Sequence, residues 1–194
     1  MQSSTATLRV ALVPRTSLLS DALLVVGGAA FVALAAQVSI PLGFTPVPIT
    51  GQTFAVLLVG ASFGSVRGAA SMLLYLLVGI AGAPVYSEQK HGWEVFTGAT
   101  GGYIVGFVVA AWLIGLLAEK GWDKRFSSSL SAMLIGSVVI YGFGLLWLYN
   151  HLNVSWSTAL EFGLYPFVLG DLIKLFLAAL ALPSAWQLVR RLKS

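Results

Sequence analysis

The stretch Gly102-Tyr-Ile-Val-Gly-Phe-Val-Val-Ala-Ala-Trp-Leu-Ile-Gly-Leu-Leu-Ala118 contains no charged residue and is apolar along almost its whole length. A helix needs about 20 predominantly apolar residues, with a range of about 17–25, to cross the hydrocarbon core of a bilayer. The stretch therefore predicts a membrane-spanning helix and places the chain among integral membrane proteins.

Four further stretches have the length and apolarity of a spanning helix, and these are residues 21–39, 66–83, 130–148 and 167–188. Residues 51–63 are also apolar, but this stretch is short for a span unless residues 46–50 enter the membrane as well. Non-helical backbone is tolerated at that depth only where protein or a cavity covers it. We therefore predict an all-α integral membrane fold, a six-transmembrane-helix bundle whose second helix is irregular.

The composition excludes other classes of protein. Hydrophobic residues make up 58% of the 194 residues, charged residues make up 9%, and the mean hydropathy is +0.90. A soluble domain has about 45–50% apolar and about 25% charged residues, so a soluble globular domain and a disordered chain are both excluded. The chain has no cysteine, which excludes disulfides and thiolate metal sites. We expect no cofactor and no metal site. We also expect no nucleic-acid partner, because the basic residues form no platform interleaved with aromatic ones.

The basic residues predict the orientation in the bilayer. In a six-span arrangement nine of the 11 Lys and Arg residues fall on one side, and these are Arg9, Arg15, Arg67, Lys120, Lys124, Arg125, Arg190, Arg191 and Lys193. Lys90 lies in a loop on the other side, and Lys174 lies inside a span. Because cytoplasmic loops carry an excess of Lys and Arg, both termini are predicted to be cytoplasmic. Residues 1–20 lack the features of a cleaved signal peptide, so we interpret them as a cytoplasmic lead-in to a single transmembrane domain, 21–194.

Asp171 and Lys174 in the last span are the strongest signal of function. An ionisable side chain inside a membrane is costly and is by default a functional hypothesis. The two residues are three apart, so they share one face of a helix and partly neutralise each other. A polar ligand site, a structural ion pair and a proton relay all remain open.

Two segments on the outer face have the composition of a binding site, although each also has a plainer interpretation. Residues 41–52 contain three prolines that prevent a helix, and they form either a stiff lid or wall of a site, or a simple connector. The segment Gly98-Ala-Thr-Gly-Gly-Tyr103 resembles a glycine-rich anion cradle at a helix N-terminus. Close helix packing explains the same glycines, and no nucleotide-binding spacing is present.

Small residues raise two further hypotheses. Gly60-Ala-Ser-Phe-Gly64 has the spacing of a nucleophile elbow around Ser62, which would make the chain a membrane-embedded serine hydrolase. Gly60, Gly64 and Gly68 recur every four residues, and this spacing fits close helix packing better than a nucleophile elbow. In the first span Ala22, Ala29, Ala33 and Ala36 leave a flat face, and the Ala29-x-x-x-Ala33 spacing lets another helix approach closely.

Four motifs occur together in order: Gln37-Val-Ser-Ile-Pro-Leu42, Phe44-Thr-Pro-Val-Pro-Ile-Thr-Gly-Gln-Thr-Phe54, Gly98-Ala-Thr-Gly-Gly-Tyr103 and Pro166-Phe-Val-Leu-Gly-Asp-Leu-Ile-Lys174. In this order and spacing the chain resembles the BioY family from about residue 21 to about residue 182. That family comprises the biotin-specific substrate-capture (S) components of energy-coupling-factor (ECF) transporters.

The resemblance implies a non-enzymatic subunit of the bacterial cytoplasmic membrane that captures biotin near the outer surface. It also implies a transmembrane coupling (T) subunit and two ATPase subunits as partners, with Ala29 and Ala33 contacting the coupling subunit. A self-sufficient proton-coupled carrier that uses Asp171 and Lys174 is the alternative.

The resemblance also implies how the ligand is bound. Asp171 accepts from a ureido N–H of biotin, Lys174 donates to the ureido carbonyl, and Lys90 meets the carboxylate. The remaining predicted site residues are Glu88, Phe44, Gln52, Tyr86, Trp93, Thr100 and Tyr103, of which Phe44, Tyr86, Trp93 and Tyr103 cover the apolar body. The chain departs from the family at residues 86–94, which replace a glycine-rich stretch, and at Ala99, which replaces a proline.

Overall fold

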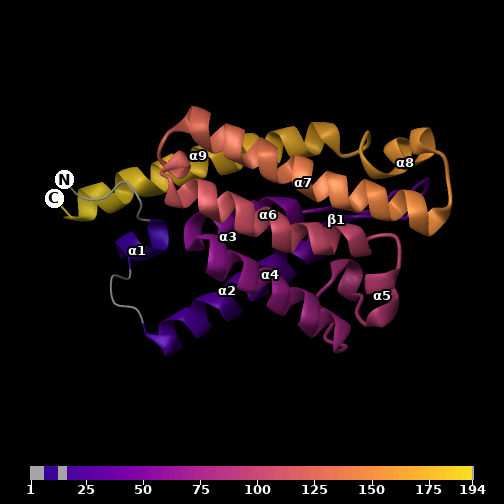
Figure 1. The fold of residues 1–194 in the computed structure, drawn as a ribbon, viewed down its shortest axis with the longest axis horizontal. Helices are drawn as coiled ribbons and strands as arrows, with labels where there is room; N and C mark the ends of the chain where they lie inside the picture. The colour runs from indigo at the N-terminus through magenta and orange to yellow at the C-terminus, as the bar shows by residue number, and fades with distance from the viewer. Residues whose placement is uncertain (1–6, 13–16, 194) are drawn as a thin grey trace.

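The computed structural model describes residues 7–12 and 17–193, which form an elongated helical bundle (Figure 1). The helices are α1 (Leu8–Leu12), α2 (Leu18–Gln37), α3 (Gln52–Phe63), α4 (Ser65–Ile80), α5 (Trp93–Thr97), α6 (Gly101–Glu119), α7 (Phe126–Leu152), α8 (Trp156–Gly163) and α9 (Val168–Lys193). Two 3-10 turns, Ser87–Gln89 and Trp122–Lys124, and a hairpin of β1 (Ser39–Ile40) and β2 (Ile49–Thr50) complete the described chain.

The all-α membrane fold expected from the hydropathy pattern is confirmed. Four helices, α2, α6, α7 and α9, are long and apolar enough to cross a membrane. Helices α3 and α4 are shorter apolar helices of 12 and 16 residues, and they lie where the irregular second helix, 51–63, and the span 66–83 are predicted. A sharp turn at Gly64 joins them, and its φ of +86° is a conformation that favours glycine.

Helix α6 forms the centre of the bundle and packs against α3, α4 and α7. Glycines make this packing close: a Cβ on Gly102 would lie 2.2 Å from the Cβ of Trp147 on α7. A Cβ on Gly60 of α3 would lie 2.8 Å from the carbonyl oxygen of Ala111 on α6. Gly60 therefore serves helix packing, as the small-residue spacing indicates. Ser62 lies inside helix α3, whereas a nucleophile elbow needs a strand-to-helix turn, so the hydrolase interpretation loses its structural basis.

The proline-rich segment between α2 and α3 folds back on itself as the hairpin. Ser39 pairs with Thr50 and Ile40 pairs with Ile49 in antiparallel register. The hydroxyl of the buried Thr45 at the hairpin tip donates to the carbonyl oxygen of Phe162 on α8, at 2.8 Å. The hairpin therefore lies across the bundle, and it supplies one wall of the cavity described below.

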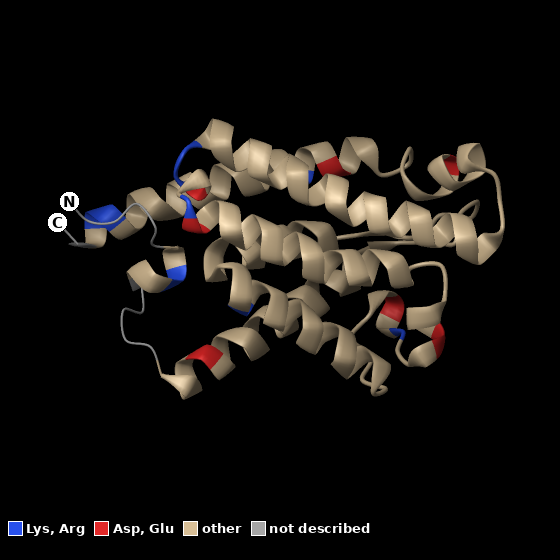
Figure 2. Ribbon diagram, viewed as in Figure 1, with Lys and Arg blue, Asp and Glu red and all other residues tan. Residues whose placement is uncertain are grey.

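Most charged residues lie toward the two ends of the bundle, and one acidic and one basic residue of α9 lie between the ends (Figure 2). At the end that carries the chain termini, Asp21 of α2 binds two arginines: Arg9 of α1 at 2.6 Å and Arg67 of α4 at 2.8 Å. The Arg9 side chain is only 1% exposed. This cluster ties α1 and α2 to α4 inside a single chain.

Candidate ligand-binding site

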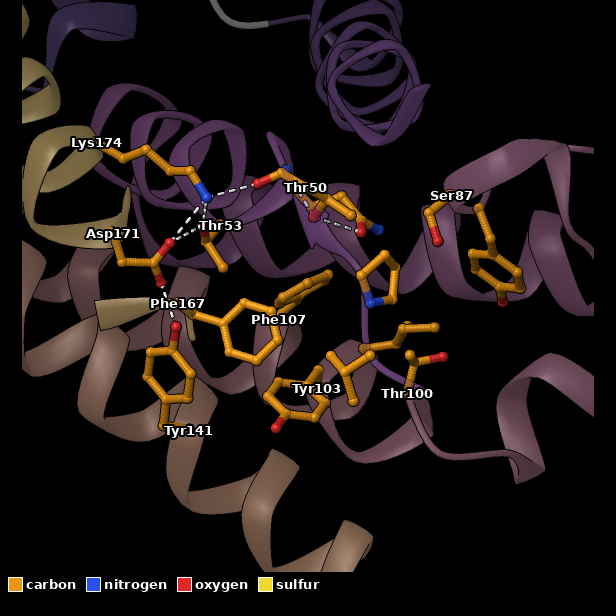
Figure 3. Close-up of a pocket in the computed structure, with 15 residues that line it drawn as sticks. Thr50, Thr53, Ser87, Thr100, Tyr103, Phe107, Tyr141, Phe167, Asp171 and Lys174 are labelled. Carbon is orange, nitrogen blue, oxygen red and sulfur yellow. Dashed lines mark hydrogen bonds and ion pairs between the residues drawn. The ribbon is translucent and has the colours of Figure 1, made fainter. Parts of the chain in front are cut away.

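A cavity lies between the hairpin and helices α3, α6, α7 and α9. Most lining residues are apolar or aromatic, and the polar ones gather at two ends (Figure 3). The lining residues are Val47, Pro48, Thr50, Gln52, Thr53, Tyr86, Ser87, Thr100, Tyr103, Ile104, Phe107, Tyr141, Phe167, Asp171 and Lys174.

Asp171 organises one end of the cavity. Its Oδ1 accepts a hydrogen bond from Lys174 Nζ at 2.8 Å, and its Oδ2 accepts one from the Tyr141 hydroxyl at 2.5 Å. Lys174 Nζ also donates to the carbonyl oxygen of Thr50, at 2.6 Å. The Thr53 hydroxyl lies 3.4 Å from Asp171 Oδ1. One carboxylate thus joins α9 to α7 and, through Lys174, to the hairpin.

The hydrogen bonds of Asp171 offset part of the free-energy cost of burying its charge in a membrane protein. Removing a charge from water is unfavourable unless the charge is paired and hydrogen-bonded. Asp171 is 6% exposed and has a cation and a neutral donor on its two oxygens. An ionised carboxylate has about four lone-pair sites, so it retains acceptor capacity for a ligand N–H.

The middle of the cavity is aromatic. Phe107 of α6 and Phe167, which directly precedes α9, are buried and contribute their rings to the lining. The Tyr103 hydroxyl donates to the carbonyl oxygen of Gly163 at 2.8 Å, and its ring meets the ring of Tyr141 edge-on at 6.2 Å between centroids. These contacts hold the rings in place, so the cavity presents a preformed apolar surface.

The other end of the cavity is polar but uncharged, with Ser87 and Thr100 facing it (Figure 3). Tyr86 lines this part of the cavity and its hydroxyl donates to the carbonyl oxygen of Leu76 at 2.7 Å. Burial raises the pKa of Tyr86 to about 12, so its phenol stays neutral at physiological pH. Gln52 Nε2 donates to the Tyr75 hydroxyl at 2.6 Å.

Gln37, the last residue of α2, holds the segment that carries Tyr86 and Ser87. Its Nε2 donates to the carbonyl oxygen of Tyr86 at 3.1 Å, and its Oε1 accepts from the backbone N–H of Gln89 at 3.3 Å. Glu88 and Gln89 both have positive φ, 59° and 58°. Such a conformation is unfavourable for residues other than glycine, so the Gln37 contacts stabilise a turn that the backbone does not favour.

Six of the ten predicted ligand-binding residues line this cavity, and they are Gln52, Tyr86, Thr100, Tyr103, Asp171 and Lys174. The other four are not among the lining residues. Lys90 pairs with Glu88 at 2.5 Å and its side chain is 57% exposed. Phe44 is 62% exposed and Trp93 is 61% exposed. The structure therefore does not bring Lys90, Glu88, Phe44 or Trp93 to the cavity.

Tyr141, Phe107 and Thr53 also line the cavity but are not among the residues predicted from the sequence. Tyr141 carries a hydroxyl in the middle of an apolar span, and this was the available signal, since a buried tyrosine hydroxyl requires a partner. The sequence gives no comparable signal for Phe107 and Thr53, because aromatic residues and threonine are common in membrane helices. Their role depends on the rotation of each helix about its axis.

The predicted partner-contact residues lie in a second concavity. Ala29 is 8% exposed and belongs to the core, whereas Ala33 is half-buried. Both line an open apolar groove of about 590 Å³ between α2 and α4, together with Ala30, Tyr75 and Gln37. Ala29 therefore packs inside this chain, while the neighbouring Ala30 is exposed.

Within the described residues, no group of three or more His, Asp or Glu side chains is placed to hold a metal ion. Both histidines, His91 and His151, are exposed.

A sequence profile of the BioY family matches residues 4–191, which is nearly the whole chain. The chain belongs to the BioY family. A protein called biotin transporter BioY from Thermotoga maritima is 40% identical over 151 residues, which are 78% of this chain and 86% of that relative. A second, from Rhizobium etli, is 37% identical over 159 residues, which are 78% of this chain and 84% of that relative.

A solved structure agrees with this BioY assignment. The crystal structure of the S-component for biotin from an ECF-type ABC transporter matches with a TM-score of 0.74 and 26% sequence identity. The match covers 92% of this chain and 95% of that chain. The resemblance expected from the four sequence motifs is confirmed.

Proposed function

We propose that this protein captures biotin and takes part in its uptake across a membrane, as the substrate-binding subunit of an ECF-type transporter. Membership of the BioY family supports this function. The observation that carries it is the cavity itself, which has an Asp171–Lys174–Tyr141 cluster at one end and an aromatic middle. Its relatives are transporters, and the protein acts as a binding and transport subunit rather than as an enzyme.

The polar groups of the cluster complement the ureido ring of biotin. That ring has two N–H donors and one carbonyl acceptor. In the proposed complex Asp171 accepts from an N–H, and Lys174 Nζ or the Tyr141 hydroxyl donates to the carbonyl. Hydrogen bonds to charged groups contribute about 1.5–3 kcal/mol each. The thioether ring and the aliphatic chain then lie against Phe107, Phe167 and Tyr103.

We further propose that six helices cross the bacterial cytoplasmic membrane, with α3 and α4 as the two short spans and both termini in the cytoplasm. Basic residues gather at the end of the bundle that carries the chain termini (Figure 2), which supports this orientation. In this arrangement residues 21–194 are one transmembrane domain, and residues 1–20 precede it. Helix α1 lies within that lead-in, and its residues Leu8 and Ala11 are buried against the bundle.

The proposed partners are a transmembrane coupling subunit and two ATPase subunits. Helix α2 is the most accessible of the four long helices. Four of its 20 residues are buried, against 11 of 19 in α6. We propose that the coupling subunit contacts α2 at the groove that Ala29, Ala30 and Ala33 line. The rest of the α2 surface faces the lipid bilayer.

Binding of biotin to the purified full-length protein in detergent tests the function. We expect saturable binding without ATP, and no competition by lipoate, which has a similar carboxylate tail but no ureido ring. Uptake into proteoliposomes should then require coupling and ATPase subunits together with ATP. Uptake by this chain alone, driven by a pH gradient, would instead establish the proton-coupled carrier. Equal binding of biotin and lipoate would contradict the proposed site.

A further inference from the structure

The two ends of the cavity differ in charge. Asp171 and Lys174 are the only charged residues among those that line it, and both lie at the same end. Lys174 Nζ lies 2.8 Å from Asp171 Oδ1, so the two charges largely neutralise each other. The opposite end presents the hydroxyls of Ser87 and Thr100 (Figure 3).

The two hydroxyls are available to a ligand. No hydrogen bond from the Ser87 or Thr100 side chain occurs within the described part of the chain, and Thr100 does not cap α6 although it is the N-cap residue. At the charged end, by contrast, Thr53 contacts Asp171 and Lys174. Free hydroxyls that face a cavity are donors and acceptors without a preference for charge.

No cation reaches the hydroxyl end in the described structure. Lys90 is close in sequence to Ser87, but its Nζ lies 2.5 Å from a carboxylate oxygen of Glu88 and its side chain is 57% exposed. It is absent from the lining. Ser87 and Thr100 are half-buried. A carboxylate that entered this end would exchange part of its hydration for hydrogen bonds from neutral groups only, and desolvation of a charge without a counter-ion is unfavourable.

We infer that the site recognises the ureido end of biotin and not the charge of its carboxylate, so that the ligand class extends to neutral biotin derivatives, such as the primary amide. This inference rests on the proposed function, because it assumes that the ureido ring occupies the Asp171 end. The tail then lies between Ser87 and Thr100, whose hydroxyls bond to a carboxylate or to an amide. An amide retains both hydrogen-bonding partners and has less hydration to lose.

A comparison of biotin with biotinamide tests the inference on the unaltered full-length protein. We expect the two dissociation constants to agree within about threefold. An ion pair with a cation would be lost on amidation, and a charge-assisted hydrogen bond corresponds to about 10- to 150-fold in affinity. Binding of biotinamide that is ten or more times weaker than that of biotin would overturn the inference and leave the proposed function standing. If neither ligand binds, the proposed function fails instead.

Variants at the hydroxyl end add a second measurement. Ser87→Ala and Thr100→Val should each weaken biotin and biotinamide by the same factor, about 2- to 12-fold for one neutral hydrogen bond. Thr97→Val is the matched control, since Thr97 lies in the same segment and its hydroxyl bonds to the carbonyl oxygen of Trp93, outside the lining. Lys90→Ala should leave the ratio of the two affinities unchanged. A Lys90→Ala variant that weakens biotin but not biotinamide would overturn the inference.

Discussion

Asp21 and Asp171 are two carboxylates in the apolar helices of one bundle. Each of them binds two side chains. Asp21 binds Arg9 and Arg67, which are both cations, at the terminal end of the molecule. Asp171 binds one cation, Lys174, and one neutral hydroxyl, that of Tyr141. The Asp21 side chain is 34% exposed to solvent, whereas that of Asp171 is 9% exposed and faces the cavity.

An ionisable residue in a membrane helix is therefore not by itself evidence of a ligand site. The carboxylate Asp21 cross-links α1, α2 and α4, and its chemistry is complete within the chain. Asp171 lies beside an apolar cavity, and its neutral partner leaves it able to accept a further donor. The two carboxylates differ in whether a cavity lies beside them and in whether both of their hydrogen-bond donors are cations.

Asp171→Asn should give the largest loss of biotin affinity. The amide keeps the volume of the carboxylate but removes the charge-assisted acceptor and leaves Lys174 without its anion. Affinity should fall about 10- to 150-fold, which corresponds to about 1.5–3 kcal/mol. Equilibrium binding of labelled biotin measures the loss, and Glu94→Gln, on the exposed outer surface, is the control. Normal binding together with poor folding would mean that the Asp171 pair is structural, like the Asp21 cluster.

Tyr141→Phe should have a smaller effect on the same site. It removes one neutral donor from Asp171 and keeps the ring that faces Tyr103. We expect biotin affinity to fall about 2- to 12-fold. Tyr149→Phe is matched to it, because Tyr149 is on the same helix and stacks on Trp156 outside the cavity. Equal effects of the two substitutions would remove Tyr141 from the proposed site.

Asp21→Asn should leave biotin affinity unchanged and lower the thermal unfolding midpoint. Loss of the carboxylate leaves the buried Arg9 side chain without its anion, and an unpaired buried charge is destabilising. Scanning calorimetry or thermofluor measurement of the detergent-solubilised protein gives the midpoint, and Asp171→Asn is the comparison. If Asp21→Asn weakens biotin binding as much as Asp171→Asn does, the distinction between the two carboxylates is wrong.

Glu119→Gln should have the smallest effect on either quantity. Glu119 Oε1 accepts from the backbone N–H and the hydroxyl of Ser65, both at 2.8 Å, and so caps the start of α4. A glutamine oxygen accepts the same two bonds, so the unfolding midpoint should stay nearly constant. Glu119→Ala removes the cap, which is worth about 0.5–2 kcal/mol. A large effect of Glu119→Gln would show that its charge, rather than its hydrogen bonds, holds this end.

The helices were predictable because bilayer thickness and hydropathy constrain them strongly. The expected span 102–118 is helix α6, Gly101–Glu119, and the expected span 130–148 lies inside α7, Phe126–Leu152. Helix α1 was not predicted, since five residues give no periodic signal. Its position depends on the contact of Arg9 with Asp21, which only the folded chain brings together.

The candidate site was predictable in part for a similar reason. Asp171 and Lys174 are three residues apart in one helix, so their proximity follows from helical geometry alone. The positions of Lys90 and Trp93 depend on a loop with two residues at positive φ, which local sequence patterns do not specify. Tyr141 reaches Asp171 only because α7 and α9 pack with a particular rotation. Sequence motifs located one end of the cavity well, but they did not define its walls.

The groove between α2 and α4 and the ligand cavity are joined by hydrogen bonds between residues that line one and residues that line the other. Tyr75 and Gln37 line the groove, while their hydrogen-bond partners Gln52 and Tyr86 line the cavity. The rings of Tyr75 and Tyr86 also meet edge-on, at 5.4 Å between centroids. An occupant of the groove that displaces Tyr75 or Gln37 would therefore change the walls of the cavity through these contacts. Thermodynamic linkage is reciprocal: the factor by which an occupant of the groove changes the affinity for the vitamin is the factor by which the vitamin changes the affinity for that occupant.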